Sequence, residues 1–387
     1  MSASKAFCFF PIFLGFAFCQ SVPEKGGEQP LALPKIQATA YVPLEKVGEY
    51  RMQEARFAAA AVINGKSIYV IGGQNSAGTI LTSIERFNIE TGESKMIANL
   101  AVGRIWAQAV LFNDKIFVFG GQSPVTRFRR SAGPSTGETL RGGPEQRAQN
   151  RINAASNIAS PGRESDLAGV DPEESVEVID LGTGAVSTVG KMPEPRSEFG
   201  CALVNGSIYV VGGKCRDQLG VDAFTNRVDI FDPVTGKWKT GPQLSAPATA
   251  NIAVVDESIV LIPGGFNGIR ALDSVFIFDP RAGKRGTLPA LCRPTSAHAA
   301  VCLDKYMFLF GDYAHPGEIL AYNLRDKTSE TFTLQYDASR HAAAVATATK
   351  IFVIGGKPER ESAPLNKIQV FELRTKPIPP AVRGDTP

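Results

Sequence analysis

Side chains that could hold a metal or catalyse a reaction are sparse in this chain of 387 residues. Its three histidines are His298, His315 and His341, and none forms the His-x-His pair that is typical of a metal site. The cysteines form no Cys-x-x-Cys pair and lack zinc-type spacing. The sequence also lacks a nucleophile elbow, an HExxH motif and a phosphate-binding loop. We therefore predict no metal and no cofactor, and we expect a binding protein rather than an enzyme.

Polar residues that could recognise a ligand lie just after glycine pairs or at the start of short strands. Many are basic or carry amides, which would suit a carboxylate, a sulfated sugar or an acidic peptide loop. If Glu198 lies within salt-bridge reach of Arg270 or Lys214 at an open mouth, an enzyme is favoured. The alternative for each position is an ordinary solvated loop residue. The candidate ligand-binding residues are Trp106, Gln122, Glu198, Lys214, Arg216, Asn267, Arg270, Tyr313, His315, His341 and Lys357.

A recurring unit determines where these residues lie. It comprises a small-residue strand, a tight turn such as Asn64-Gly65, and a β-branched and aromatic strand that ends in Gly-Gly. Asn-Gly favours a two-residue hairpin, and the period of about 40–50 residues indicates a repeat architecture. The copies end at Gly72-Gly73, Gly120-Gly121, Gly212-Gly213, Gly264-Gly265, Gly311-Asp312 and Gly355-Gly356.

Arginines open four of the copies, at Arg56, Arg104, Arg196 and Arg340. Because the same side chain recurs at the same place, we expect it to satisfy backbone carbonyls between neighbouring copies, which would be the blades of a propeller, rather than to contact a ligand. A third strand follows each glycine pair after a variable loop. The predicted third strands are Ser83–Asn88, Ser175–Asp180, Arg227–Asp232, Ser274–Asp279, Glu318–Asn323 and Lys367–Glu372.

The two ends of the repeat region complement each other. Residues 36–47 resemble the outer strand of a blade, whereas the proline-rich stretch after the last third strand cannot supply the N–H groups of a ladder. Pairing of the first strand with the last blade would close the ring and protect its edges. We therefore predict an all-β fold, a six-bladed β-propeller over residues 36–373.

Segments outside the blades differ in composition. The insertion 123–174 is polar, with a basic first half and an acidic end, so we expect a disordered surface loop. The alternative is a basic arm that folds over a ligand or an acidic partner. Residues 20–35 are expected to be a disordered lead-in, and 374–387 a proline-rich tail.

Residues 1–19 have the features of a signal peptide. Lys5 precedes the apolar run Phe7–Phe18, which is shorter than the roughly 20 residues that a membrane span needs. We predict cleavage before Gln20 and a secreted or periplasmic monomer with no stable membrane span; a retained anchor or a lipid on Cys19 is the alternative. The net charge of +3 and the lack of basic runs mixed with aromatics argue against nucleic acid.

Four cysteines remain beyond this segment: Cys201, Cys215, Cys292 and Cys302. An exported protein could oxidise one pair, and Cys292 with Cys302 is the nearest in sequence. We nevertheless expect them to stay free, with one disulfide as the alternative, since Cys201 and Cys302 lie among small apolar residues where a thiol packs as a hydrophobe.

The repeats resemble those of the kelch-repeat family, over about residues 36–373. The family pattern of Arg, Gly-Gly and Phe-Asp-Pro-x-Thr-Gly-x-Trp is clearest in residues 196–238. Copy four lacks the arginine and carries Pro263, and copy five has Asp312 in place of glycine. The resemblance implies four-stranded blades whose loops converge on an axial channel. It suggests a non-catalytic module that binds a glycan or a protein through that loop face.

The alternative function is a carbohydrate-active enzyme. Sialic acid mutarotases are exported kelch propellers with an enlarged second-blade loop, and their chemistry is thought to need an acid and an arginine in a channel loop. Arg270 would match the arginine, but no acid lies between Gly265 and Arg270. The chain is also distantly similar to galactose oxidase propellers, whose copper needs two His and two Tyr; we expect no copper here.

Overall fold

The computed structural model describes residues 43–124, 170–246, 248–249, 253–255, 258–280 and 283–374. Contacts divide the chain into two units, Met1–Ala40 and Tyr41–Pro387, and every described residue belongs to the second. The predicted signal peptide, the lead-in, most of the 123–174 insertion and all of the tail after Arg374 lie outside the described residues.

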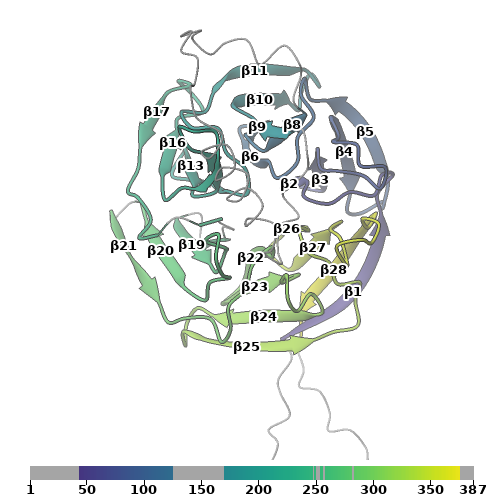
Figure 1. Ribbon diagram of the computed structural model, residues 1–387. Helices are drawn as coiled ribbons and strands as arrows, with labels where there is room; N and C mark the ends of the chain where they lie inside the picture. The colour runs from purple at the N-terminus through teal and green to yellow at the C-terminus, as the bar shows by residue number, and fades with distance from the viewer. Residues whose placement is uncertain are drawn as a thin grey trace, which may run out of the picture. The chain divides into compact units, whose positions relative to one another are not determined.

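Six four-stranded antiparallel sheets build the second unit, and two short two-stranded sheets accompany them. The six sheets stand around a common axis as the blades of a β-propeller (Figure 1). Every regular element in the described part of the chain is a β-strand. The predicted fold class and blade number are therefore confirmed.

Each blade runs from an inner to an outer strand. Blade one contains β2 (Ala60–Asn64), β3 (Ser67–Ile71), β4 (Ser83–Asn88) and β5 (Ser94–Asn99). Blade two contains β6 (Gln108–Phe112), β7 (Lys115–Phe119), β10 (Ser175–Asp180) and β11 (Val186–Lys191). Blade three contains β12 (Gly200–Val204), β13 (Ser207–Val211), β16 (Val228–Phe231) and β17 (Trp238–Thr240).

The second half of the ring has the same order. Blade four contains β18 (Ala253–Val255), β19 (Ile259–Pro263), β20 (Val275–Asp279) and β21 (Lys284–Leu288). Blade five contains β22 (Ala299–Leu303), β23 (Tyr306–Phe310), β24 (Glu318–Asn323) and β25 (Thr328–Thr333). Blade six contains β26 (Ala343–Ala346), β27 (Lys350–Ile354), β28 (Lys367–Leu373) and β1 (Leu44–Arg51).

Two hairpins lie outside the blades. The strand β8 (Gln122–Pro124) pairs with β9 (Val170–Pro172), and β14 (Lys214–Arg216) pairs with β15 (Asp222–Phe224). Arg216 links the hairpins, because its guanidinium lies 2.9 Å from the carboxylate of Asp171 and donates to the carbonyl of Val170. The two ends of the long insertion are thus held in one hairpin that is tied to the loop of blade three.

Closure of the ring follows the prediction. The strand β1 pairs antiparallel with β28, from Leu44 opposite Leu373 to Arg51 opposite Lys367. The described strand extends to Arg51, four residues beyond the predicted end at 47. After the buried Leu44, the residues of β1 are half-buried or exposed, and Glu45, Lys46 and Glu49 are charged. The apolar pattern that would mark a strand in the sequence is therefore weak here.

The glycine pairs permit close contact between neighbouring blades. Gly72 and Gly73 both have positive φ, 63° and 89°, and the N–H of Gly73 donates to the carbonyl of Arg104 in blade two at 2.9 Å. A Cβ on Gly72 would lie 2.5 Å from the same carbonyl. A larger residue would therefore force the two blades apart.

Apolar side chains fill the spaces between blades. Trp238 on β17 packs on Phe231 of its own blade and on Phe119 of blade two, with ring centroids 4.8 Å and 5.9 Å apart. Such contacts, repeated around the ring, bury the aliphatic and aromatic residues of the second and third strands. Tight packing of this kind fixes the loops that surround the axis.

Candidate functional site

Five residues at the starts of blades surround the axis with left-handed backbone. Their φ angles are 51° for Ala58, 54° for Trp106, 53° for Glu198, 58° for Ala297 and 51° for His341. Left-handed conformations cost a non-glycine residue about 1–2 kcal/mol, so contacts must hold them.

Backbone hydrogen bonds between blades supply those contacts. The N–H of His341 donates to Ala297, that of Ala58 to His341, that of Trp106 to Ala58, and that of Glu198 to Trp106, at 2.8–3.3 Å. This chain of bonds links blades five, six, one, two and three around the axis. It brings together Trp106, Glu198 and His341, which the sequence had grouped by their place in the repeat.

A cavity of about 320 Å³ lies at this axial ring. Five of the predicted site residues line it: Trp106, Glu198, Arg270, Tyr313 and His341. They come from blades two to six, so the cavity is shared by nearly the whole ring. The residues that line it also include Phe266, Ile269, His298 and Asp312, which we did not predict.

Three other predicted residues lie outside the cavity lining and have structural partners. Gln122 is buried and its amide lies 3.3 Å from the hydroxyl of Ser197. Lys214 pairs with Asp222 at 2.9 Å, across the hairpin β14–β15, and not with Glu198. Arg216 pairs with Asp171, as described above.

The remaining predicted residues shape neighbouring loops. The side-chain oxygen of Asn267 accepts from the N–H groups of Ile269 and Arg270, at 3.0 and 2.9 Å, and so fixes the turn that carries Arg270. The ammonium group of Lys357 lies 5.2 Å from the ring centroid of Phe57. His315 lies over Asp312 in the network described next.

Asp312 organises one side of the mouth. Its carboxylate accepts hydrogen bonds from Arg293 at 2.6 Å, from the hydroxyl of Thr295 at 3.0 Å and from the N–H of Ser296 at 3.0 Å, and Nδ1 of His315 lies 3.2 Å away. Burial acts to raise the pKa of Asp312, but the bonds from Ser296 and Arg293 outweigh it and lower the pKa. The sequence feature that could have indicated this network is Asp312 itself, which takes the place of the second glycine of the Gly-Gly pair.

His298 is the most buried titratable group at the cavity, with 2% of its surface exposed. Burial lowers its pKa to about 4, against the opposing effects of Asp312 and the backbone of Pro263. The ring is therefore neutral at pH 7. His298 could not be recognised from the sequence, because its neighbours are the small residues typical of an inner strand.

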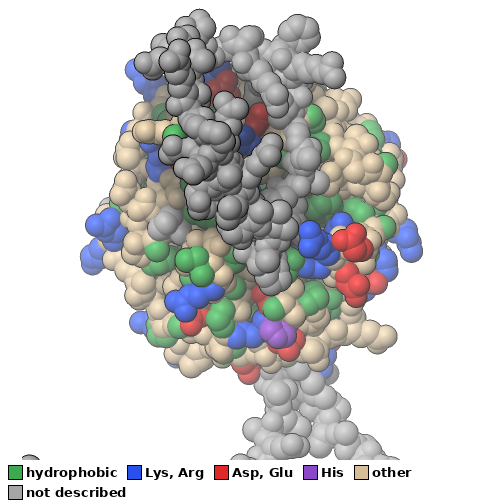
Figure 2. All heavy atoms as spheres, viewed as in Figure 1, with side chains coloured by type: hydrophobic (Ala, Val, Ile, Leu, Met, Phe, Trp, Pro, Cys, Tyr) green, Lys and Arg blue, Asp and Glu red, His purple; other side chains and the backbone are tan. Residues whose placement is uncertain are grey.

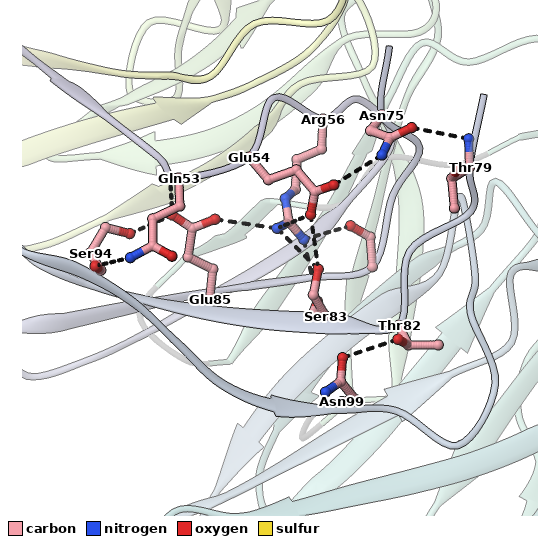
Figure 3. Close-up of polar contacts among 11 residues, drawn as sticks. Gln53, Glu54, Arg56, Asn75, Thr79, Thr82, Ser83, Glu85, Ser94 and Asn99 are labelled. Atoms are coloured by element: carbon pink, nitrogen blue, oxygen red, sulfur yellow. Dashed lines mark hydrogen bonds and ion pairs between the residues drawn. The ribbon is translucent and has the colours of Figure 1, made fainter. Parts of the chain in front are cut away.

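The arginines that open blades one to three are structural and donate to backbone carbonyls, as predicted. Those carbonyls belong to each arginine's own blade rather than to a neighbouring one, and the acidic partners were not predicted. Arg56 is fully buried and donates to the carbonyl of Gly72 at 2.9 Å and to the carboxylate of Glu85 at 3.2 Å (Figure 3). Arg104 pairs with Glu177 and Arg196 with Asp229 in the same manner. Burial lowers the pKa of Arg56, while Glu85 and Glu54 act to raise it.

The prediction for Arg340 was wrong. Its backbone bridges Lys357 in the way that Phe57 bridges Gln74, so Ser339 occupies the place of the blade-opening arginine. The hydroxyl of Ser339 donates to Gly355 at 2.8 Å. The Arg340 guanidinium instead stacks on the Tyr313 ring, 4.3 Å from its centroid, beside the cavity.

Blades four and six lack both the buried arginine and its acidic partner. Where blades one to three have the buried pair, blade four has Ala248 with Phe276, and blade six has Ser339 with Gln369, at the equivalent backbone positions. A buried charge without its partner is strongly destabilising, which explains the joint loss.

Exposed apolar side chains lie on the mouth loops of blades three and four. The exposed fractions are 86% for Leu219, 56% for Val221 and 88% for Ile269. The two loops touch, since the rings of Phe224 and Phe266 are 5.9 Å apart. Charged side chains on the visible face gather in small groups of both signs (Figure 2).

The described residues contain neither a metal-binding cluster nor a membrane-spanning helix. No group of three or more His, Cys, Asp or Glu side chains in this part of the chain is placed to hold a metal ion. None of its elements is a helix with the length and apolarity to cross a membrane. Cys201, Cys215, Cys292 and Cys302 are free thiols, so the predicted alternative of one disulfide does not occur.

The architecture defines a six-bladed β-propeller with a polar axial cavity. A kelch motif model matches residues 55–101 and 195–245, which cover blades one and three. The chain is thus a β-propeller that carries kelch motifs in blades one and three.

Relatives among known proteins also include a kelch-repeat protein. Beta-scruin of Limulus polyphemus is 22% identical over 336 residues, 84% of this chain and 27% of that protein. Alpha-scruin of the same animal is 24% identical over 56% of this chain and 20% of its own length. Kelch repeat and BTB domain-containing protein 12 of Danio rerio is 26% identical over 54% of this chain and 30% of its own length. The chain thus spans about a fifth to a third of the curated relatives it matches.

Proposed function

We propose that this propeller is a non-catalytic binding module that holds a protein partner on its mouth face. The observation that carries the proposal is the set of exposed apolar residues Leu219, Val221 and Ile269 on two touching loops. A solvent-exposed apolar patch beside a rigid concave mouth is typical of a protein interaction site. The kelch motifs of blades one and three support the same function.

The rim of the patch suits a partner with acidic groups. Arg270 follows Ile269 directly, is exposed, and has no carboxylate partner among the described residues. Charged rims steer association and add specificity, whereas buried apolar anchors supply most of the affinity. A protein is favoured over a glycan, because a glycan offers little apolar surface to Leu219 and Ile269.

Site-specific photocrosslinking in the native host would test the proposal. A photoreactive phenylalanine analogue at Ile269 should capture a discrete partner, while the same analogue at Val234 should not. Val234 is 76% exposed and lies in the turn after β16, at the opposite end of the blade. Ile269→Asp should weaken binding of that partner about tenfold or more. Equal capture from both positions would refute a specific mouth-face site.

A second candidate function is the mutarotase-type enzyme. It is favoured by the placement of Glu198 and Arg270 in one cavity. Exchange of sialic acid anomers, followed by NMR, should accelerate with the wild type and fall to the uncatalysed rate with Glu198→Gln. The same rate with and without protein would exclude this candidate.

We further propose that the protein is exported through residues 1–19, on the basis of Lys5 and the apolar run Phe7–Phe18. N-terminal sequencing of the mature protein should give Gln20 as the first residue. An intact Met1 on cell-retained protein would contradict export.

A further inference from the structure

We propose that a second cavity, between blades three and four, binds a free fatty acid, with its chain between the two blades and its carboxylate at Arg285. The two blades are neighbours at the left of Figure 1. No residue lines both this cavity and the axial one. The inference is therefore independent of the protein partner proposed for the mouth face.

The cavity has the size and the lining of a small-molecule site. Its volume is about 530 Å³, within the roughly 300–1,000 Å³ that is usual for such sites. Most of its lining is aliphatic or aromatic, and its aromatic rings are those of Tyr209, Phe276 and Phe278. Among the described residues of the lining, Arg285 alone carries a charge. The lining thus suits an apolar molecule with one negative group.

The interface between blades three and four is filled less completely than the other five. Phe278 is half-buried, and it occupies the place that Phe231 has in blade three, just before the aspartate that ends the strand pattern. Its equivalents in the other five blades are no more than 1% exposed. They are Phe87, Ile179, Phe231, Tyr322 and Phe371.

The linker into blade four shows the same difference. The N–H of Leu244 donates to the carbonyl of Asn226 at 2.8 Å, as the N–H of Met192 donates to Glu174 in the preceding linker. Leu244 is only half-buried and lines the cavity. The residues that make the equivalent bond in four other linkers are no more than 4% exposed, and they are Met52, Leu100, Met192 and Leu291.

One substitution on the outer strand accounts for much of the open space. Trp238 pairs with Phe231 across blade three, and it packs on Phe119 between blades two and three. Arg285 pairs with Phe278 across blade four in the same way. Cross-strand partners share one face of a sheet, so Arg285 lies on the face of Phe278. A guanidinium keeps its charged end in water, so it does not fill the space that an indole fills.

Arg285 is a suitable anchor for an anion at the rim of this cavity. It is exposed, its guanidinium donates to the carbonyl of Gln243 at 3.4 Å, and it forms no ion pair with a carboxylate of the described residues. Lys46 has the equivalent place in blade six, opposite Phe371, but it pairs with Glu49 at 2.8 Å. Arginine matches a carboxylate through two parallel N–H groups. A cation beside an apolar slot is the pattern that a fatty acid requires.

Calorimetric titration with decanoate, below the concentration at which it forms micelles, would test the proposal. The wild type should bind one decanoate saturably. Octanoate is two methylene groups shorter and should bind about tenfold more weakly, because less apolar surface is buried. Decanol has the same chain without the charge and should bind about fivefold more weakly or worse.

Variants at one position separate charge from space. Arg285→Ala should weaken decanoate binding about fivefold or more, because it removes the cation. Arg285→Trp copies Trp238 of blade three and should abolish binding by filling the cavity. Decanoate should raise the melting temperature of the wild type and leave that of Arg285→Trp unchanged. Lys46→Ala is the matched control and should bind decanoate as the wild type does.

A further variant distinguishes this site from the mouth face. Ile269→Asp, which should lose the protein partner, should keep the wild-type affinity for decanoate. Loss of decanoate binding in Ile269→Asp would place the chain on the mouth-face patch and overturn the cavity site. The absence of saturable binding to the wild type, or equal binding by the wild type and both Arg285 variants, would overturn it as well. Sedimentation of the wild type, but not of Arg285→Trp, with phosphatidylglycerol vesicles and no response to decanoate would assign the acyl chain to a membrane lipid and overturn a free fatty acid.

Discussion

The buried pair of Arg56 and Glu85 should couple strongly in a double-mutant cycle. Both side chains are 0% exposed, and the closest nitrogen and oxygen atoms are 3.2 Å apart. Arg56→Met leaves the buried carboxylate of Glu85 without its cation. Glu85→Leu leaves the buried guanidinium of Arg56 with only the partly exposed carboxylate of Glu54, 3.4 Å away. Breaking such a pair typically costs about 3–5 kcal/mol of unfolding free energy.

The double variant Arg56→Met with Glu85→Leu should lose much less than the sum of the two single losses. Both charges are then removed together, as blade four has done with Ala248 and Phe276. Glu85 also accepts from the N–H of Gln53 at 2.6 Å, but that loss occurs in both Glu85 variants and cancels in the cycle. We expect a coupling energy of about 2–3 kcal/mol.

Urea unfolding of the four proteins would measure the coupling, provided that each unfolds in one transition. The exposed pair Lys66–Glu90, 2.9 Å apart with both side chains more than half exposed, is the matched control and should show little coupling. If the two single losses at Arg56 and Glu85 simply add, to within about 0.5 kcal/mol, the argument from unpaired buried charge is refuted.

Three other predictions follow from described contacts. Because the pKa of His298 is lowered to about 4 in the fold, the folded state binds fewer protons than the unfolded chain below pH 6.5, and stability should fall as the pH drops towards 4. His298→Gln should remove about 3 kcal/mol of that pH-dependent loss; an unchanged pH profile by urea titration would contradict a buried neutral ring. Gly73→Ala should lower the melting temperature measured by circular dichroism, because its Cβ would lie 2.8 Å from the carbonyl of Phe57 at a φ of 89°; an unchanged value would contradict the close approach. In the native protein a thiol reagent should label the exposed Cys292 first, whereas burial raises the pKa of the Cys201 thiol and should keep it unreactive until unfolding; equal labelling rates by mass spectrometry would count against this placement.

The fold was predictable from the sequence because each blade repeats a local pattern. Alternation of β-branched and aromatic residues, turns such as Asn64-Gly65 and the glycine pairs mark the second and third strands. The predicted bounds of the third strands agree with the structure to within a residue. The outer strand β1 was placed less well, since one face of it is solvated and its composition is mostly polar.

The site was predictable only in part, because it depends on contacts between distant loops. The positions of Trp106, Glu198 and His341 follow from their place in the repeat, and the structure brings them to one cavity. The partners of Lys214 and Arg216 come from a hairpin that the sequence pattern did not reveal. Arg340 was misassigned by one residue, since the backbone bridge to Lys357 and not the residue type defines the register.

The pairing of β1 with β28, which closes the ring, has a consequence for biosynthesis. Arg51 and Asn366, whose side chains form a hydrogen bond where the ring closes, are 315 positions apart in the chain. At roughly 5–20 residues per second, the first strand leaves the ribosome about 15–60 s before its partner exists. During that interval it is an unpaired edge, and its charged residues Lys46 and Glu49 keep such an edge from joining a neighbouring nascent chain. The polar composition that makes β1 hard to recognise in the sequence thus also protects the incomplete propeller from association with other chains.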